Sequence, residues 1–394
     1  MAERCGYIQP PTKKAGVKRL WIQAVSVGEL NSLKPLLTLL KENPAVEVVL
    51  SVTTTTARKL AEEKFVGLYV YLFTFPLDNC SGRIMDRLKA DQLMLVDSEL
   101  WPELLHGAQK RKMPVVLINA RISDRSYRRM RFLSGPTKWI LKKLTLILTS
   151  TPQDTEKFLQ LGANPELVYE TGNLKFDTTH SRTMEPTQRA EMLKSLGWNE
   201  KDMILVGSST WAGEEMALLN IYKEIKAEVP GLKLLIVPRH AERRAEVEAV
   251  IKTSGLAYHR RTAGQVSGSP EVVLADTTGE LANLVQLGAV VFVGKSLRPH
   301  TMGQSPIDAA AAGKPILMGP GMSSFKNISE TLVAARGGMF VGGPHELKEA
   351  TRYLLTHEKE RAAMGAAALA WYEKNRGATQ RVLEYLELEA PVSA

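Results

Sequence analysis

Short apolar runs rich in β-branched residues alternate along the chain with longer amphipathic stretches. In the first half, six such runs are expected to form buried parallel strands: Leu20–Val25, Val46–Val52, Tyr69–Phe73, Leu93–Val96, Val115–Ile118 and Leu144–Leu148. Helical patterns lie between several of these runs, among them Leu30–Lys41, Thr56–Lys64 and Glu103–Lys112. Repeated strand–helix units of this kind predict a doubly wound α/β domain.

A second series of strands follows a polar stretch, Asp177–Trp198, that predicts a linker with a short helix. Its expected members are Met203–Val206, Leu232–Val237, Val272–Leu274, Ala289–Val293, Ile316–Met318 and Gly338–Val341. The sequence therefore predicts two Rossmann-like, doubly wound domains facing a central cleft, as in the GT-B architecture. The expected segments are a domain over 1–178, a linker over 179–199, a domain over 200–365 and a C-terminal helix over 366–394 that packs back on the first domain. Fold alone does not define a function.

Composition and charge narrow the class of protein. With 394 residues, 44% of them hydrophobic and 24% charged, the chain is neither disordered nor collagenous, and two cysteines make no disulfide scaffold. No apolar run is long enough to suggest a membrane-spanning helix. The net charge is +9, yet Leu105–Lys143 alone holds eleven lysines and arginines against one acidic residue, Asp124. This local basic segment predicts an anionic partner.

The basic segment also contains apolar side chains, among them Tyr127, Phe132 and Trp139. Basic and aromatic residues together suit a surface that meets anionic lipid head groups. They also suit a nucleic acid, and a plain solvated helix is the third interpretation. The sequence alone leaves these alternatives open.

Polar motifs follow the expected strands of the first half, where ligands bind in doubly wound folds. Ser26-Val27-Gly28-Glu29 places a carboxylate at a helix start; the simpler interpretation is that Glu29 only complements the helix dipole. Asp97-Ser98-Glu99-Leu100-Trp101-Pro102 is a candidate general-base or sugar-binding cluster, although Glu99 could instead cap a helix and Trp101 could pack in the core. Asn119-Ala120-Arg121 leads into the basic segment.

The strand ends of the second half carry small and basic residues. Ser208, Ser209 and Thr210 follow one strand, where backbone N–H groups could hold an anion at a helix N-terminus. Arg239 and His240 end the next strand, and an arginine there can grip a phosphate. Three further loops are candidates for a nucleotide-sugar site, through Gly279 and Glu280, Gly294 and Ser296, and Ser305 and Asp308. No His, Cys and carboxylate spacing predicts a metal site.

In order along the chain, these motifs resemble the 3-deoxy-D-manno-octulosonic acid (Kdo) transferases of lipopolysaccharide synthesis. The resemblance rests on WIQAVSVGE, LMLVDSELWP, VVLINARIS, TGNLKFD, GSSTWAGEE, LLIVPRH, DTTGEL, VGKSL, GQSPIDAA and GPGMSSF. It implies an inverting GT-B enzyme without metal or cofactor that moves Kdo from CMP-Kdo to a lipid A precursor, lipid IVA. It also implies a peripheral protein on the anionic cytoplasmic face of the inner membrane, with no nucleic acid partner.

The resemblance further implies roles for individual residues. Domain 1–178 would bind the acceptor and domain 200–365 the nucleotide sugar. Glu29 would be the general base and Glu99 an essential acceptor-side residue, both catalytic. The implied acceptor-binding residues are Ser26, Gly28, Arg121 and Arg125. The implied nucleotide-sugar-binding residues are Ser208, Ser209, Thr210, Arg239, His240, Gly279, Glu280, Gly294, Ser296, Ser305 and Asp308.

This chain departs from the family's usual pattern in several places. Gln23 stands where a histidine is frequent, and Lys295 stands at the second glycine of a common Gly-Gly-Ser-Leu. Gln304 and Ser305 alter the loop before Asp308, and Ser324 replaces a usual asparagine. The family usually begins with a hydrophobic anchor, whereas this chain starts about where that anchor would end. A GT-B transferase of another nucleotide sugar and a basic nucleic-acid-binding protein are the alternatives.

Overall fold

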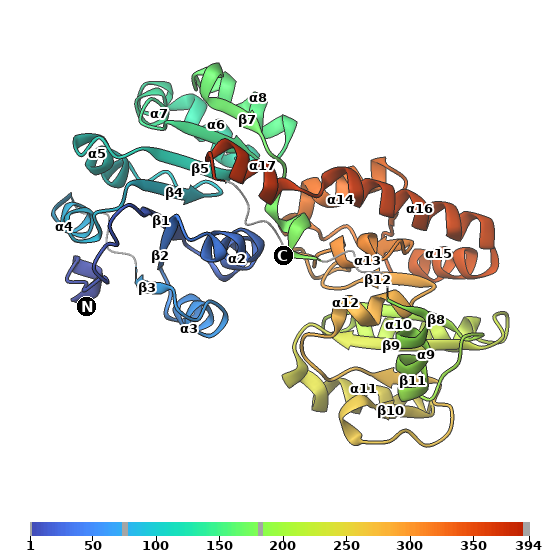
Figure 1. Ribbon diagram of the computed structural model, residues 1–394. Coiled ribbons are helices and arrows are strands. Elements are labelled where there is room, and N and C mark those ends of the chain that lie inside the picture. Colours follow the sequence, from blue (N-terminus) through green and yellow to red (C-terminus); the bar gives the residue numbers. More distant parts are fainter. Residues whose placement is uncertain (1, 73–77, 180–183, 389–394) are drawn as a thin grey trace. The chain divides into compact units, whose positions relative to one another are not determined.

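A computed structural model describes residues 2–72, 78–179 and 184–388. The chain forms two compact units (Figure 1): one is coloured from blue to green and also includes the red C-terminal helix, and the other is coloured from green to orange-red. Unit 1 contains Met1–Thr178 together with the C-terminal stretch Asn375–Ala394, and unit 2 contains Thr179–Lys374. In each unit one parallel sheet lies between layers of helices (Figure 1). The predicted α/β architecture with two doubly wound domains is confirmed.

The sheet of unit 1 has the strand order β3-β2-β1-β4-β5-β6-β7, and every neighbouring pair is parallel. The order reverses direction between β1 and β4, so the crevice that binds ligands in such sheets opens there. The strands are β1 (Lys18–Ala24), β2 (Val46–Val52), β3 (Tyr69–Leu72), β4 (Gln92–Val96), β5 (Val115–Ala120), β6 (Leu146–Thr149) and β7 (Val168–Glu170).

Helices cover both faces of this sheet, which explains why stretches of its central strands such as Leu93–Val96 and Val115–Ile118 are apolar on every residue. Leu20 and Ile22 of β1 pack on one face with α1 and α2, whereas Trp21 packs on the other with Leu104 of α5. The helices of unit 1 are α1 (Val27–Ser32), α2 (Lys34–Glu42), α3 (Thr55–Lys64), α4 (Asp78–Leu88), α5 (Pro102–Lys110), α6 (Asp124–Phe132), α7 (Ser134–Leu141), α8 (Pro152–Gln160), α17 (Ala378–Tyr385) and the 3₁₀ turns η1 (Glu3–Cys5), η2 (Pro165–Leu167) and η3 (Leu174–Thr178).

Unit 2 repeats the plan with the strand order β10-β11-β9-β8-β12-β13-β14, again parallel throughout. Here the order reverses between β8 and β12. The strands are β8 (Met203–Thr210), β9 (Leu232–Pro238), β10 (Tyr258–Arg260), β11 (Val272–Leu274), β12 (Val290–Val293), β13 (Ile316–Met318) and β14 (Gly338–Phe340). Its helices are α9 (Pro186–Ser195), α10 (Glu214–Ile225), α11 (Arg244–Ser254), α12 (Leu281–Leu284), α13 (Ile307–Ala311), α14 (Lys326–Ala334), α15 (Pro344–Thr356), α16 (Glu358–Asn375) and the 3₁₀ turns η4 (Ala241–Arg243), η5 (Arg261–Ala263), η6 (Val285–Leu287) and η7 (Ser323–Phe325).

The structure adds two strands that the sequence analysis did not predict, β7 and β10. Both are three-residue strands at a sheet edge, and their side chains are mostly not buried, so they carry no apolar run. The predicted strand residue Phe73 lies outside the described residues. Ser208, Ser209 and Thr210, expected in a loop, are instead the last residues of β8.

The boundaries between segments also differ from the expected ones. Part of the expected linker packs into unit 2, because Leu193, Leu196 and Trp198 are buried there and the Trp198 indole N–H donates to the carbonyl of Pro270 at 2.8 Å. Helix α16 runs through the expected boundary at residue 365. The last helix, α17, belongs to unit 1, where Asp177 accepts the amide N–H groups of Gly377 (2.7 Å) and Thr379 (2.6 Å).

Candidate active site

Glu29 lies at the reversal point of the unit 1 sheet, in the first turn of the helix that follows β1. Ser26 is the N-cap residue of α1, and the Glu29 amide donates to its hydroxyl at 3.2 Å. In return the Ser26 hydroxyl donates to Oε1 of Glu29 at 2.9 Å, and the Val25 amide donates to Oε2 at 2.7 Å. This reciprocal arrangement is close to a capping box. It holds the carboxylate in one position beside the crevice.

The surroundings of Glu29 raise the pKa of its carboxyl into the neutral range. Burial raises the pKa of this carboxyl to about 7, because the charged form loses hydration. The negative charges of Asp97 and Glu99 add to the rise, whereas the hydrogen bonds from Val25 and Ser26 oppose it. A carboxyl with a pKa near the working pH is suited to general-base catalysis. Glu29 thus combines the helix-start position of the simpler interpretation with a pKa near neutrality.

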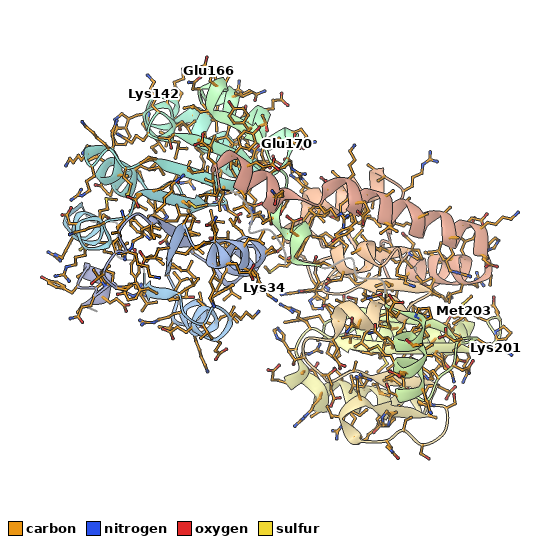
Figure 2. The ribbon with its side chains drawn as sticks, in the orientation of Figure 1. Lys34, Lys142, Glu166, Glu170, Lys201 and Met203 are labelled. Atoms are coloured by element: carbon orange, nitrogen blue, oxygen red, sulfur yellow. The ribbon has the colours of Figure 1, made fainter. Side chains whose placement is uncertain are left out.

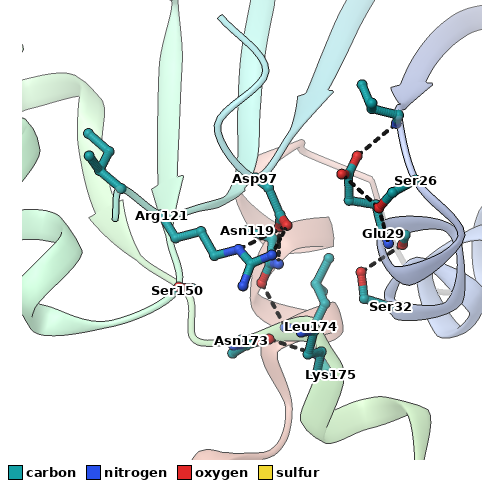
Figure 3. A network of polar contacts seen from close by, with 12 residues as sticks. Ser26, Glu29, Ser32, Asp97, Asn119, Arg121, Ser150, Asn173, Leu174 and Lys175 are labelled. Carbon is teal, nitrogen blue, oxygen red and sulfur yellow. Dashed lines mark hydrogen bonds and ion pairs between the residues drawn. The ribbon is translucent and has the colours of Figure 1, made fainter. Parts of the chain in front are cut away.

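A second carboxylate, Asp97, stands at the end of β4 and organises its neighbours (Figure 3). Its Oδ1 accepts from the side-chain amide of Asn119 at 2.6 Å, and its Oδ2 accepts from Nε of Arg121 at 2.9 Å. Asp97 and Asn119 both adopt left-handed backbone conformations, with φ of 59° and 51°. Non-glycine residues in that region are uncommon and cluster at functional sites.

The segment after β7 completes this cluster from another part of the chain. The Leu174 amide donates to Oδ1 of Asn119 at 3.0 Å, which fixes η3 against the ends of β4 and β5. Lys175 follows, next to the cluster in Figure 3. Burial lowers the pKa of its ammonium group, the neighbouring Arg121 lowers it further, and the charges of Asp97 and Glu29 oppose the shift. The sequence analysis included Asp97 in a candidate general-base or sugar-binding cluster, but it assigned no role to Asn119 or Lys175.

Glu99, the second predicted catalytic residue, lies two residues beyond Asp97 in the same loop. Its Oε2 accepts from the indole N–H of Trp101 at 2.8 Å. Burial raises the pKa of the Glu99 carboxyl, and Asp97 contributes in the same direction. Trp101 is half-buried and packs against the core, as the simpler interpretation expected. The structure therefore places Glu29 and Glu99 around Asp97, close enough for their charges to interact.

The predicted acceptor-binding arginines differ in their surroundings. Arg121 is paired with Asp97, so much of its charge is already compensated inside the unit. Arg125, by contrast, is exposed on α6, a helix with no buried residue. Other exposed cations of α6, α7 and the α7 C-cap surround it: Arg128, Arg129, Arg131, Lys138 and Lys142. Lys142 is labelled on the outside of unit 1 in Figure 2.

Apolar side chains emerge among these cations. Phe132 is 88% exposed, Leu133 52% and Trp139 48%, in the stretch where α6 gives way to α7. Lys143 contacts the Trp139 ring, with Nζ 3.9 Å from its centroid. We call α6, α7 and Lys142 the basic apolar surface. Neighbouring cations and exposed large apolar groups are a combination that suits an anionic, partly apolar partner.

In unit 2 the glycine-rich loop after β12 does not offer its amides to a ligand. The buried carboxylate of Glu214 accepts from the amides of Lys295 (2.6 Å), Ser296 (2.9 Å) and Leu297 (3.0 Å), and also from that of Trp211 (2.9 Å). The Gly294 amide donates to the carbonyl of Ser208 at 2.8 Å. The backbone donors expected at Gly294 and Ser296 therefore have partners within the protein, the Ser208 carbonyl for Gly294 and the Glu214 carboxylate for Ser296.

Other predicted nucleotide-site residues of this region have structural partners. Ser208, Ser209 and Thr210 are buried in β8, so they form no open anion loop, and the Thr210 hydroxyl donates to Glu215 at 2.9 Å. The Ser296 hydroxyl is buried between the carbonyl of Val293 and the amide of Gly319. A side chain at Gly294 would meet the Ser209 carbonyl oxygen at 2.6 Å, so this glycine permits the close approach of two strand ends.

Two predicted acids of unit 2 also face other groups of the protein. Glu280 is held by a two-bonded ion pair with Arg261, at 2.8 and 2.7 Å, and the arginine lowers its pKa. Gly279 precedes it with φ of 88°, in the left-handed region. Asp308 accepts from the hydroxyl of Thr179 at 2.7 Å, and burial raises its pKa. The Ser305 hydroxyl accepts from the amide of Ile307 at 3.3 Å.

Basic and aromatic side chains of unit 2 lie instead around Trp211, which follows β8. His240 meets the Trp211 ring edge-on with centroids 5.3 Å apart, and His300 does so at 6.4 Å. Lys295 lies over the ring with Nζ 4.4 Å from its centroid. Arg239 and His240 are exposed at the end of β9. These residues form a positively charged, aromatic group at the reversal point of the sheet, which suits an anionic ligand with a flat ring.

Within the described residues, no helix is long and apolar enough to cross a membrane. The same part of the chain contains no group of three or more histidine, cysteine or acidic side chains placed to hold a metal ion.

Two parallel sheets of Rossmann type, each with polar groups at its reversal point, define a protein of the GT-B class. The fold agrees with that of UDP-GlcNAc 2-epimerase from Neisseria meningitidis bound to UDP-GlcNAc, at a TM-score of 0.64 over 94% of this chain and all of the other. The co-structure of MnaA from S. aureus with UDP gives a TM-score of 0.62 over 96% of this chain and 99% of the other. Sequence identities of 14% and 15% limit both likenesses to the fold.

Sequence comparison identifies the family. Residues 1–178 match the family model described as 3-deoxy-D-manno-octulosonic-acid transferase. The 3-deoxy-D-manno-octulosonic acid transferase of Bordetella pertussis is 31% identical over 93% of this chain and 86% of its own length. That of Haemophilus influenzae is 29% identical over 98% and 90%. The chain belongs to the Kdo transferase family, and the predicted glycosyltransferase class is confirmed.

Proposed function

We propose that this protein transfers Kdo from CMP-Kdo to a lipid A precursor, lipid IVA, with inversion at the anomeric carbon. Family membership supports Kdo as the transferred sugar. The observation that carries the mechanism is Glu29, a positioned carboxyl at the reversal point of the unit 1 sheet with a pKa raised to about 7. At cytoplasmic pH a large fraction of such a group is ionised and still basic enough to take a proton.

In the proposed reaction Glu29 removes the proton from a sugar hydroxyl of the acceptor. The hydroxyl oxygen forms a bond to the anomeric carbon of Kdo while the bond from that carbon to the phosphate oxygen of CMP breaks. CMP departs with the electron pair, and the proton remains on Glu29 until solvent removes it. Ser26 and the Val25 amide keep the carboxylate in place during this step.

Unit 2 is proposed to take the donor through its positively charged aromatic group. Negative charge grows on the phosphate as CMP leaves, and a guanidinium stabilises it with two parallel donors. Arg239, exposed at the end of β9, is the residue proposed for this role. Because cationic side chains supply the compensating charge, the reaction is proposed to need neither a metal ion nor a cofactor, and EDTA should leave the rate unchanged.

The basic apolar surface of unit 1 is proposed to hold the protein on the cytoplasmic face of the inner membrane. Each cation near an anionic surface contributes about 1 kcal/mol, and α6 and α7 offer several. Phe132, Leu133 and Trp139 would enter the head-group layer, which explains their exposure. The same cations would meet the phosphates of the lipid acceptor.

Mass spectrometry of lipid IVA after incubation with the protein and CMP-Kdo tests the proposal. We expect products heavier than the acceptor by one or more Kdo residues, and none when UDP-GlcNAc replaces CMP-Kdo. An unchanged acceptor with CMP-Kdo, in the presence of detergent that disperses the lipid, would contradict the assigned donor and acceptor. Product formed with UDP-GlcNAc would favour a transferase of another nucleotide sugar.

A further inference from the structure

Lys295 has a backbone conformation that a lysine rarely adopts. It is the second residue of the loop after β12, with φ of 57°, in the left-handed region where glycine is at ease. Two hydrogen bonds hold it there: its amide donates to Oε2 of Glu214 at 2.6 Å, and its carbonyl accepts from the amide of Gly303 at 2.8 Å. The fold therefore needs this conformation, and a glycine would meet the need without strain.

The side chain of Lys295 extends to the aromatic ring of Trp211. Its ammonium nitrogen lies 4.4 Å from the ring centroid, and His240 and His300 meet the same ring edge-on. Lys295 and Trp211 are both half-buried, so solvent reaches the pair. The lysine follows β12 and the tryptophan follows β8, the two strands between which the sheet order reverses.

The two acidic residues that follow Trp211 most closely in the sequence do not pair with the Lys295 ammonium. Glu214 is buried and accepts hydrogen bonds from backbone amides. Glu215 is buried, accepts from the hydroxyl of Thr210 and forms an ion pair with Arg243. Among the residues that the structure describes, no carboxylate lies within ion-pair distance of the Lys295 ammonium. Its charge is stabilised by an aromatic face and by water, which leaves it available to an anion.

Stability does not account for a lysine at this position. A cation over an aromatic ring at a solvent-exposed site gains no more than a left-handed conformation costs an L-residue. A residue that is strained, charged and placed at a ligand-binding edge indicates a role in binding.

We propose that Lys295 binds an anionic group of the sugar nucleotide, with Trp211 holding the ammonium in reach of it. The inference rests on the proposed function and adds to it a donor contact from the loop after β12. Two groups of CMP-Kdo share the required chemistry, the phosphate and the carboxylate of the sugar acid. Lys295 would thus make recognition of the donor in this chain more dependent on charge.

Two variants test the proposal, Lys295→Gly and Lys295→Asn, since both residues tolerate the left-handed conformation. Calorimetric titration with CMP and the donor KM in steady state are measured, together with the thermal midpoint. We expect an unchanged or higher midpoint. If the phosphate is the ligand, CMP binds about tenfold more weakly; if the carboxylate is, CMP affinity is kept and the donor KM rises about tenfold. Arg244→Ala, which removes an exposed cation of α11, should change neither quantity.

Two results would overturn the proposal. One is that CMP affinity and donor KM both stay as in the parent protein. The other is that weaker binding comes with a lower thermal midpoint in both variants, because the lysine would then only fasten the loop to Trp211. The CMP titration needs no acceptor and no turnover, so it remains informative even if the protein proves not to transfer Kdo.

Discussion

The hydroxyl of Ser26 and the carboxylate of Glu29 hold each other in place: the hydroxyl donates to Oε1 at 2.9 Å and accepts from the Glu29 amide at 3.2 Å. A helix cap normally keeps its carboxylate in water, where its pKa stays low. Here the Glu29 carboxyl is buried, Asp97 and Glu99 add negative charge nearby, and its pKa rises to about 7. One pair of residues thus begins a helix and sets the proton affinity of the proposed base.

The pH dependence of transfer should follow the ionisation of Glu29. A protonated carboxyl cannot accept a proton, so kcat/KM should fall about tenfold per pH unit below pH 7 and level off above it. The profile from pH 5 to 9 is the measurement. Neutralising the neighbouring charge with Glu99→Gln should lower the pKa of Glu29 and move the inflection toward acid. An inflection near pH 4.5 in the parent would mean that Glu29 is not desolvated.

Glu214→Ala should destabilise unit 2. Four backbone amides would lose their acceptor inside the unit, which costs at least about 3 kcal/mol. For a unit of this size the thermal midpoint should drop by about 6–12 °C. The exposed Glu242 serves as the control, since Glu242→Ala should leave the midpoint within about 1 °C. Equal midpoints for both variants would show that the loop amides do not depend on Glu214.

The two sheets could be predicted from the sequence because both faces of each are covered. Runs such as Leu93–Val96 and Val115–Ile118 are apolar on every residue, and twelve of the fourteen strands that the structure describes coincide with a predicted run. The edge strands β7 and β10 have no such pattern, and only the pairing with β6 and β11 reveals them.

The candidate site was predictable only in part. A carboxylate after the first strand follows from the motif, so Glu29 could be named. Its raised pKa comes first from burial and then from the charges of Asp97 and Glu99, and only the fold provides both. Asn119 and Leu174 meet across 55 positions of sequence. The loop after β12 has the composition of an anion site, yet Glu214, 82 residues away from Ser296, occupies its amides. Local composition does not reveal that a side chain from a distant part of the sequence bonds to the amides of a predicted ligand site.

The basic apolar surface should decide binding to anionic membranes. Reversing the charge of Arg125, Arg128 and Arg129 together should weaken binding to vesicles with anionic lipid by on the order of 100-fold or more, at about 1 kcal/mol per cation. Vesicle sedimentation at low salt measures this. Binding of the parent protein should also fall as salt rises, because charges are screened over roughly 8 Å at physiological ionic strength.

Lys14, Lys59 and Lys64 provide a matched control, being exposed cations of unit 1 away from α6 and α7. The same triple reversal at these positions should have a much smaller effect. If both triple variants sediment like the parent, the membrane contact lies elsewhere. If the α6 variant instead loses affinity for nucleic acid at physiological salt, the alternative partner gains support.

Arg239→Ala should raise the KM for the donor and leave the KM for the acceptor unchanged. A charged hydrogen bond to phosphate contributes about 1.5–3 kcal/mol, so the donor KM should rise on the order of 10- to 100-fold. The acceptor KM and vesicle binding should stay as they are, because Arg239 belongs to unit 2 and the basic apolar surface to unit 1. Arg244→Ala is the control. A donor KM that stays constant would rule out contact between Arg239 and the phosphate.

The central claim, that Glu29 is the base of a Kdo transferase, is tested most directly by the transfer rate of Glu29→Gln. Glutamine keeps the size of the side chain and an oxygen that can accept from the Val25 amide, so the helix cap and CMP affinity should be preserved. With CMP-Kdo and lipid IVA at pH 8, we expect the rate to fall by about 10²–10⁴ relative to the parent protein. A folded variant that transfers Kdo within a few-fold of the parent rate would contradict the account.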